Sequence, residues 1–379
     1  MKKLNFFVLA ASLSLVACAP KSQTIEVSNS LDFARNGELV SAQVDLSTPH
    51  VLKDAQGQEV AYQVVDNQIF FLASVPASAS STYTWQEGTP ADVEPLTAAF
   101  FLGDRRKDDF CWENDKAAYR MYGPALLPEN PSSGVDLWLK HSSQLTADAM
   151  YKQEEGGRPY HVDYGLGIDS YKVGHAAGCG GLAIVYDNQI WPGGPYAKYE
   201  VLQQGPLQSI FRLSYDSVQV GQCVLTEDIT ITVNAGADMN KAEVVLHGED
   251  LGDIQLGGAI FLHDSIQNLE CYPKAGTVTY CESANSDKGI YKIHEQQGID
   301  ASTLDFGRNY CAVYVPGAEN FDQLANTQTA TRSYKLGDTL TYYFGGAWSK
   351  RDYATDDEWK AAINADAQCI DNPLSVTVK

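Results

Sequence analysis

Apolar and polar residues alternate with a period of two along most of this chain. Typical stretches are NQIFFLASV (67–75), SIFRLSYDSVQV (209–220), LTEDITITVNA (225–235) and LTYYFGGAW (340–348). They are rich in Val, Ile, Thr, Tyr and Phe and are bounded by Gly, Asn, Asp and Pro, which is the pattern of half-buried β-strands. We therefore expect an all-β protein built as a large sandwich or a closed sheet.

Helical spacing of apolar residues is clear in one segment, DDEWKAAINADAQ (356–368), and a further helical turn is expected within SQLTADAMYKQ (143–153). No self-similarity with a period of 20–50 residues is present, which disfavours solenoids and propellers. Strands should therefore form nearly all of the core.

The first residues predict export. Lys2 and Lys3 precede the apolar run LNFFVLAASLSLVA, and together residues 1–17 have the form of a secretory signal peptide that is too short to span a membrane. The following LVAC resembles a bacterial lipobox, which implies cleavage before Cys18 and acylation of that residue. We expect a lipoprotein on the periplasmic side of the outer membrane or on the cell surface.

The mature chain is expected to contain two structural units. Residues 18–30 would be a lipid-anchored tether, residues 31–90 a small β-rich N-terminal region, and residues 91–379 a large β-sandwich catalytic domain. The boundary is placed near residue 90 because a Pro/Ser/Ala/Thr-rich connection precedes it.

Charge narrows the range of ligands. The formal net charge is −21, from 27 Lys and Arg against 48 Asp and Glu, and a surface of this kind repels nucleic acid and anionic lipid. Residues 105–172 differ, because nine cations and eleven acids leave a net charge of only −2. This locally neutralised region is what an anionic substrate would require, although internal salt bridges would give the same count.

Polar and aromatic residues gather in four segments within or beside these strands. The segments are FCWENDKAAYRMYGPAL (110–126), SGVDLWLK (133–140), PYHVDYGLGIDSYKVGHAAGCGG (159–181) and GGAWSKRDY (345–353). Degradation of an acidic sugar by elimination requires a base, an acid and a group that offsets the sugar carboxylate. We expect His161 and a tyrosine, Tyr164 or Tyr122, to exchange the protons.

The other predicted site residues would bind the substrate. Arg120, Asn114, Lys172 and Lys140 would hold the carboxylate, and arginine suits this role best because its fork matches two oxygens. The indole faces of Trp112 and Trp348 would stack on a sugar ring.

Other chemistries have less support. The chain contains no GxSxG and no HExxH, and GCGG (178–181) lacks the GK[ST] of a phosphate loop. His175 and Cys179 alone do not make a metal site, so no cofactor is expected. Glycosidase carboxylate pairs, Glu113 with Asp115 or Asp163 with Asp169, remain open. Cys271 and Cys281 are the expected disulfide pair.

With these segments assembled, WENDK (112–116) and YHVDYGLGIDSYKVG (160–174) resemble a bacterial family of formerly unknown function found in polysaccharide-utilisation loci. The resemblance covers most of residues 98–360, and the family includes an ulvan oligosaccharide dehydratase. It implies a β-sandwich like those of mutarotases and many lyases. It also implies an enzyme that removes water from a non-reducing-end uronate, leaving a 4,5-unsaturated residue.

The sequence is compatible with three functions. The first is this carbon–oxygen lyase, whose partner would be an acidic oligosaccharide. The second is a polysaccharide lyase, which performs the same elimination with a sugar as the leaving group. The third is a lipoprotein that captures glycans without catalysis.

Overall fold

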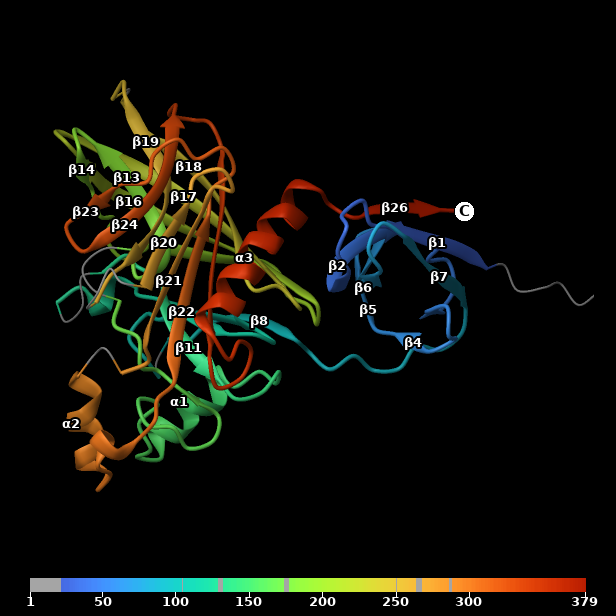
Figure 1. Ribbon diagram of the computed structural model, residues 1–379, viewed down its shortest axis with the longest axis horizontal. Helices are drawn as coiled ribbons and strands as arrows, with labels where there is room; N and C mark the ends of the chain where they lie inside the picture. Colours follow the sequence, from blue (N-terminus) through green and yellow to red (C-terminus); the bar gives the residue numbers. More distant parts are fainter. Residues whose placement is uncertain are drawn as a thin grey trace, which may run out of the picture.

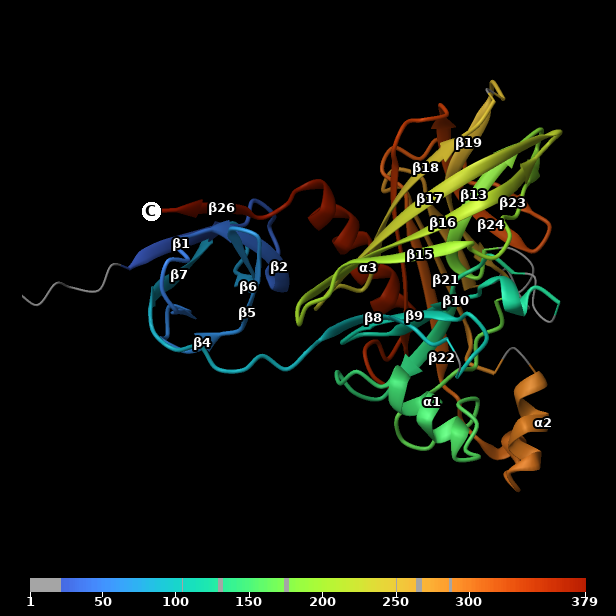
Figure 2. The same ribbon diagram turned by 180° about the vertical axis from the view of Figure 1, so that it is seen from behind.

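The computed structural model describes residues 22–103, 105–128, 132–173, 177–249, 251–263, 268–285 and 288–379. It shows a small N-terminal β-domain beside a much larger β-sandwich (Figures 1 and 2). The predicted signal peptide and the acylated Cys18 lie outside the described residues.

The small domain consists of two antiparallel sheets. The first contains, in order, β26 (Ser375–Val378), β1 (Gln23–Ser28), β7 (Ser80–Glu87), β3 (His50–Lys53) and β4 (Glu59–Val60). The second contains β2 (Arg35–Gln43), β6 (Gln68–Val75) and β5 (Tyr62–Val65). Ile25, Val27, Phe71 and Trp85 are almost fully buried between them.

Both ends of this domain differ from the expected boundaries. Residues 23–28 fall within the predicted tether, yet they form β1 and pair with β7. β26 falls within the range predicted for the large domain, yet it pairs with β1, with Val27 opposite Val376. The small domain is therefore completed by a strand from the other side of the large domain.

An eight-stranded and a five-stranded antiparallel sheet form the large sandwich. The eight strands are β15 (Lys198–Gln203), β16 (Gln208–Val220), β17 (Cys223–Asn234), β18 (Asn240–His247), β25 (Leu340–Trp348), β22 (Arg308–Tyr314), β21 (Thr277–Ser283) and β20 (Leu269–Tyr272). The five strands are β14 (Gln189–Ile190), β13 (Cys179–Tyr186), β19 (Ile254–Phe261), β24 (Thr327–Tyr334) and β23 (Gln323–Leu324). Alternate residues of the long strands, such as Phe211, Ile231 and Val313, enter one shared core. The predicted all-β sandwich is confirmed.

A second five-stranded sheet adjoins the sandwich and holds four of the nine predicted site residues, Trp112, Asn114, Arg120 and Lys140. Its strands are β8 (Thr97–Phe101), β9 (Phe110–Asn114), β10 (Ala118–Met121), β11 (Asp136–Lys140) and β12 (Gly167–Ile168). Every residue of β9, β10 and β11 is buried, because one face packs on the main core and the other is covered by the helix α1 (Ala147–Glu155). Polar residues on this second face therefore lie inside the protein.

The C-terminal helix α3 (Asp356–Asp371) confirms the one strong helix prediction. It packs on the outer face of the eight-stranded sheet, where Trp359 and Ile363 lie against Tyr310 and Tyr314 (Figure 1). Because α3 covers this face, β22 is buried on both sides almost throughout.

Two helical segments lie at the opposite end of the sandwich from β19 and β18 (Figure 1). α1 confirms the turn expected within residues 143–153. α2 (Gly289–Gln296), followed by the 3-10 turn η3 (Ala301–Thr303), was not predicted, because its eight residues are too few to show a helical period. A third short turn, η1 (Pro124–Leu126), follows β10.

The expected disulfide is contradicted. Cys271 lies opposite Val278 in the β20–β21 ladder, so Cys281 is three residues further along the partner strand, too far for an S–S bond. The seven cysteines of the described chain are all free. None of its helices combines the length and apolarity needed to cross a bilayer.

Candidate functional site: a cleft edge supported by a buried arginine network

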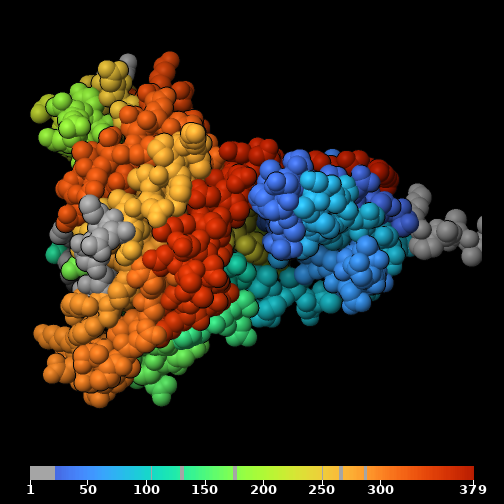
Figure 3. Space-filling model, in the orientation of Figure 1, coloured from blue at the N-terminus to red at the C-terminus, as the bar shows by residue number. Residues whose placement is uncertain are grey.

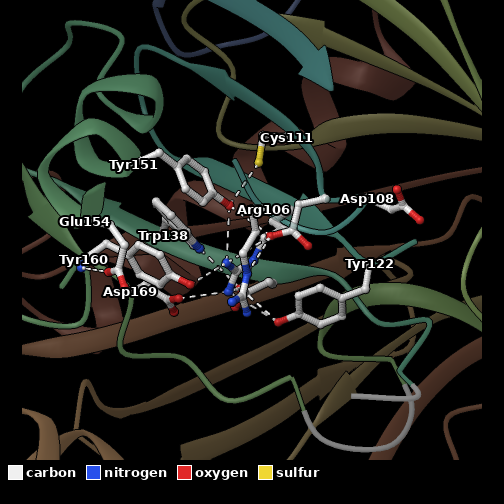
Figure 4. A network of polar contacts seen from close by, with 12 residues as sticks. Arg106, Asp108, Cys111, Tyr122, Trp138, Tyr151, Glu154, Tyr160 and Asp169 are labelled. Atoms are coloured by element: carbon white, nitrogen blue, oxygen red, sulfur yellow. Dashed lines mark hydrogen bonds and ion pairs between the residues drawn. The ribbon is translucent and has the colours of Figure 1, made fainter. Parts of the chain in front are cut away.

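Arg120 on β10 belongs to a buried polar network. Figure 4 shows the side chains of Tyr122, Trp138 and Tyr160 around the charged groups of this network. The guanidinium of Arg120 donates to Asp136 Oδ2 at 2.8 Å, to Asp169 Oδ2 at 2.9 Å and to Asp109 Oδ2 at 3.3 Å. All four of these residues are at most 3% exposed. Arg120 thus faces three carboxyl groups, and Arg106 adds a second cation, whose Nε lies 3.3 Å from Asp109 Oδ2.

Aromatic rings close the network from outside. The guanidinium carbon lies 4.9 Å from the ring centre of Trp138, 5.1 Å from that of Tyr122 and 5.4 Å from that of Tyr160. Burial, with the neighbouring Asp136 carboxylate, raises the pKa of Asp169 well above its usual range. The network is buried, and within it Asp109 Oδ1 and Asp136 Oδ1 have no hydrogen-bond partner among the described residues.

This geometry corrects two predicted roles. Arg120 cannot offer its fork to a substrate carboxylate, because protein carboxylates already occupy it. Tyr122 is 5% exposed and its hydroxyl donates to Asp136 Oδ2 at 3.2 Å, so it is part of the same support rather than a proton donor to a ligand.

Three further predicted substrate ligands are also structural. Lys140 is 1% exposed, and its ammonium donates to Glu113 Oε2 at 2.8 Å and to the Asn114 carbonyl at 2.6 Å. The Asn114 amide donates to the carbonyls of Asn234 and Ala237, which fastens the β9–β10 turn to the β17–β18 hairpin.

Trp112 is fully buried and stacks on Tyr119 at 5.5 Å in the main core. Strands covered on both faces explain all of these corrections, because the alternating polar positions meet α1 instead of solvent.

The carboxylates considered as glycosidase pairs are likewise engaged. Glu113 accepts hydrogen bonds from the backbone amides of Thr146 and Ala147 and so anchors the start of α1. Asp115 accepts from the amide of Gly236 at 2.7 Å. Asp163 bonds His141, and Asp169 belongs to the arginine network. Neither pair therefore presents two unengaged carboxyl groups.

His161 is placed differently, at the exposed edge of the network. Its Nδ1 lies 2.8 Å from the backbone carbonyl of Asp169, and its side chain is 30% exposed. A carbonyl oxygen can only accept, so Nδ1 carries the proton and Nε2 keeps its lone pair. Burial lowers the pKa of His161 below its usual value. The ring is thus a neutral base with its acceptor nitrogen away from the network.

Tyr164 and Arg158 lie beside this histidine on the same loop. The Tyr164 hydroxyl donates to Gln297 Oε1 at 3.3 Å, across to the residue that follows α2. The guanidinium of Arg158 lies 5.5 Å from the Tyr164 ring centre. Arg158 is exposed and has no ion pair with any residue that the structure describes. The sequence analysis missed it, although it precedes His161 by only three positions.

A cavity of ≈ 200 Å³ separates this loop from the α2–η3 segment. Trp348 and Phe306 supply its aromatic lining, and Asp163, His294 and Lys350 its polar side chains. Ligand pockets usually measure about 300–1,000 Å³, so this one has room for a single small ring.

Trp348 is the predicted stacking residue that does line a cavity. It is 2% exposed, however, and its indole donates to the Phe306 carbonyl at 2.8 Å, so it offers an edge rather than an open platform. The ring of His141 lies 4.6 Å from it, and His141 also bonds Asp163. His141 and His294 were not predicted, and nothing in their local sequence distinguishes them.

Lys172 is exposed, as a carboxylate ligand would have to be, and its backbone carbonyl is bonded by His263 Nε2 at 2.5 Å. His263 Nδ1 faces both Glu282 oxygens at 2.9 Å. Both ring nitrogens thus face acceptors, so His263 links β21 to the loop that carries Lys172. His175 lies outside the described residues. Within the described part, no three His, Cys, Asp or Glu residues are grouped to hold a metal.

Residues 27–376 match the model of a family described as "Domain of unknown function (DUF4861)". The chain belongs to this family. It is also 25% identical over 407 residues to "Uncharacterized protein P7" of Formosa agariphila, with 99% of this chain and 98% of that protein covered. The two proteins therefore share their whole length.

Two solved structures resemble the DUF4861 chain in three dimensions. A protein in the glycosyl hydrolase family 38 from Enterococcus faecalis matches with a TM-score of 0.54 at 8% identity, over 94% of this chain and 47% of that one. An alpha-mannosidase from Enterococcus faecalis V583 matches with a TM-score of 0.49 at 7% identity, over 94% and 46%. The DUF4861 chain spans about half the length of these proteins, and the first likeness shows the fold alone.

Proposed function

We propose that this protein is a carbon–oxygen lyase that eliminates water from the non-reducing-end uronate of an acidic oligosaccharide of the ulvan type. The observation that carries the proposal is the tautomer of His161, whose Nδ1 proton is held by the Asp169 carbonyl. This leaves Nε2 as a base on the loop whose next residues, Val162 and Asp163, line the cavity. Support also comes from the sequence resemblance to a family that includes an oligosaccharide dehydratase. The likeness in fold to a glycosyl hydrolase family 38 protein is consistent with it.

The proposed reaction uses three side chains of the loop that follows α1. Nε2 of His161 takes the proton from the carbon beside the carboxylate, and the electron pair forms the 4,5 double bond. The C4–O bond breaks, and the hydroxyl leaves as water with the phenolic proton of Tyr164. Arg158 pairs with the carboxylate and so offsets the charge that builds on it. His161 then returns its proton to Tyr164.

The size of the cavity favours dehydration over chain cleavage. A space of ≈ 200 Å³ between Asp163 and Trp348 admits one terminal ring, whereas a lyase acting within a chain needs room on both sides of the bond it breaks. A lipid anchor at Cys18 and a place at the periplasmic side of the outer membrane or at the cell surface remain part of the proposal. Mass spectrometry of the protein purified from its membrane would reveal the acyl chains.

The decisive experiment incubates the protein with saturated oligosaccharides ending in glucuronate or iduronate. We expect ultraviolet absorbance from the unsaturated product and a mass loss of one water, with the chain length unchanged. Chain cleavage would instead establish the polysaccharide lyase. Binding without a change in mass would establish the glycan-capture protein.

Variants test the assignment separately. His161→Gln should lower kcat by about 10²–10⁴-fold, the usual contribution of a general base, whereas the exposed His247→Gln should change nothing. Arg158→Gln should mainly raise KM, with partial recovery in Arg158→Lys. Full activity of His161→Gln would show that the base is another residue.

A further inference from the structure

A second and larger cavity lies between the two domains, far from the His161 loop. Its volume is ≈ 460 Å³, within the usual range of about 300–1,000 Å³ for ligand sites. One wall is the start of β2 in the small domain, and the others are the β17–β18 turn and the last turns of α3. Figure 3 shows the small domain, in blue, meeting the red C-terminal helix on this side of the molecule.

Small side chains keep the space open. The cavity is lined by Ala235 and Ala237 of the β17–β18 turn and by Ala362 and Ala365 of α3. Because these side chains are short, the turn and the helix leave a gap between them. The domains do touch beside this gap: a Cβ added to Gly236, at φ +77°, would lie 2.4 Å from the Gly37 carbonyl oxygen. Close backbone contact at one edge and alanines at the other produce a hollow that side chains do not fill.

Carboxyl groups provide the polar part of the lining. Asp366 on α3 makes no hydrogen bond or ion pair with any residue of the described ranges. Asp238, whose side chain is 10% exposed, accepts from the Tyr353 hydroxyl at 2.5 Å through Oδ2, while its Oδ1 lies 3.7 Å from the ammonium of Lys116. Asp366 is thus a partly buried carboxyl group without a protein partner in the described ranges, and a ligand would supply one.

An anionic ligand does not suit this lining. The guanidinium of Arg35 already donates hydrogen bonds to Glu38 and to the carbonyls of Cys369 and Asn372. Lys241 pairs with Glu243 at 2.9 Å. Lys116 faces Asp238, which leaves Asp366 as an acid without an ion pair among the described residues, so a uronate would be repelled.

A further cation is not favoured at Asp238, because the ammonium of Lys116 already faces it. Burial, together with the Asp238 carboxylate, raises the pKa of Asp366 well above its usual range, and burial raises that of Asp238. Carboxyl groups that keep their protons both donate and accept hydrogen bonds, as sugar hydroxyls do. The rings of Tyr343 and Tyr353 supply the aromatic surface that a sugar ring covers.

We propose that the cavity between the domains binds a neutral sugar unit, through the carboxyl groups of Asp238 and Asp366 and the rings of Tyr343 and Tyr353. This site is distinct from the proposed uronate site and does not depend on the reaction proposed there. A glycan held at both places would be anchored by a neutral unit while its acidic end is processed.

Isothermal titration calorimetry on the full chain tests this, with D-xylose and D-mannose as neutral probes, putrescine as a diamine and D-glucuronate as an anion. We expect saturable binding of a neutral sugar. Asp366→Leu should weaken it by about tenfold, as expected for a lost hydrogen bond of about 1.4 kcal/mol. Ala365→Trp should abolish it by filling the space, whereas Ala361→Trp, on the exposed face of the same helix, should not.

The variant Asp366→Asn distinguishes a neutral sugar from an amine. An uncharged amide can replace the hydrogen bonds of a protonated carboxyl group, but it cannot replace the charge of an ionised one. A sugar site should keep binding in this variant, and an amine site should lose it. The proposal is overturned if only putrescine or glucuronate binds, if neither sugar binds, or if Ala365→Trp leaves sugar binding unchanged. His161→Gln should bind the sugar normally, so failure of the proposed reaction and failure of this site are told apart.

Discussion

Arg120 is surrounded by carboxylates that the chain brings from three separate segments. Asp109 precedes β9, Asp136 begins β11, and Asp169 follows β12. Removing one partner of a buried ionic network leaves the others without compensation, which costs more than the network itself contributes. The residue is therefore expected to determine stability and not substrate affinity.

Arg120→Gln should lower the free energy of unfolding by about 3–5 kcal/mol, the cost of breaking a buried ion pair. Arg212→Gln removes an exposed pair with Glu200 and should cost about 0–1 kcal/mol. Urea unfolding followed by circular dichroism measures both. A normal unfolding curve combined with a raised KM for Arg120→Gln would restore the substrate-binding role predicted from the sequence.

The proposed role of His161 as the base predicts how kcat/KM depends on pH. As a base it must be neutral, and burial places its pKa below the ordinary 6.5. The value of kcat/KM should therefore be flat near pH 7 and fall as the pH drops through this lowered pKa. An acid limb centred above pH 6.5 would contradict the assignment.

Glu227 on β17 is a buried acid that the proposed reaction does not use. It faces a small cavity lined by Met121 and Tyr215, and burial raises its pKa to about 8. The folded chain thus keeps a proton that the unfolded chain releases near pH 4.5. The contribution of Glu227 to the free energy of unfolding is fully present below pH 4.5. It is lost as the pH rises to about 8, at about 1.4 kcal/mol per pH unit.

Glu227→Gln should remove this loss. The variant should be several kcal/mol more stable than the wild type at pH 8 and close to it at pH 5. Thermal unfolding at the two pH values measures the difference. Parallel pH profiles for both proteins would show that Glu227 is already ionised in the fold.

At the scale of elements, the alternating pattern was enough to predict the strands. β25 covers the same residues as the predicted LTYYFGGAW, and α3 begins where DDEWKAAINADAQ begins. The pattern could not show that β10 and β11 are covered on both faces, because alternation of polar and apolar residues is the same for a solvated face and for an internal polar layer. The wrong roles of Arg120 and Lys140 follow from that ambiguity.

The predicted site residues that are not part of the buried network have a physical reason for their position too. His161 and Tyr164 lie on a loop, where exposed polar side chains are usual, so the sequence indicated them without knowledge of any partner. Trp348 lines the cavity because it is the last residue of β25, which ends beside it. His294 meets Asp163 at the cavity through contacts between segments more than 100 residues apart, such as Tyr164 with Gln297, and no local pattern encodes these.

The start of α3 offers a test at this scale. Thr355 Oγ1 accepts from the Glu358 amide, and the Glu358 carboxylate accepts from the Thr355 amide, which completes a capping box. Thr355→Ala should cost about 1 kcal/mol and loosen Trp359 from the sheet. Ala361→Ser, on the exposed face, is the control. Equal stability of the two variants would mean that packing alone holds the helix.

At the scale of the whole molecule, the chain passes between the domains twice. It leaves the small domain after β7, builds the sandwich, and returns through Pro373 to supply β26. Val376 and Val378 pack against the small core. The large domain is in effect an insertion between β7 and β26.

Val376→Asp should therefore weaken the small domain and leave the sandwich intact. Placing a charge against Ile25 and Val27 should cost about 1–3 kcal/mol, whereas Ser375→Asp, at an exposed position of the same strand, should be nearly neutral. Hydrogen exchange read by mass spectrometry should show faster exchange in residues 23–28 only. Uniform acceleration across both domains would indicate a single cooperative unit.

The position of β26 also sets an order of events during synthesis. β1, β7 and the rest of the small domain leave the ribosome first, yet the outer edge of β1 has no partner until the entire sandwich has been translated. During that interval the edge is an open template for another strand, including that of a neighbouring nascent chain. The part of the protein that is made first is the part that finishes folding last.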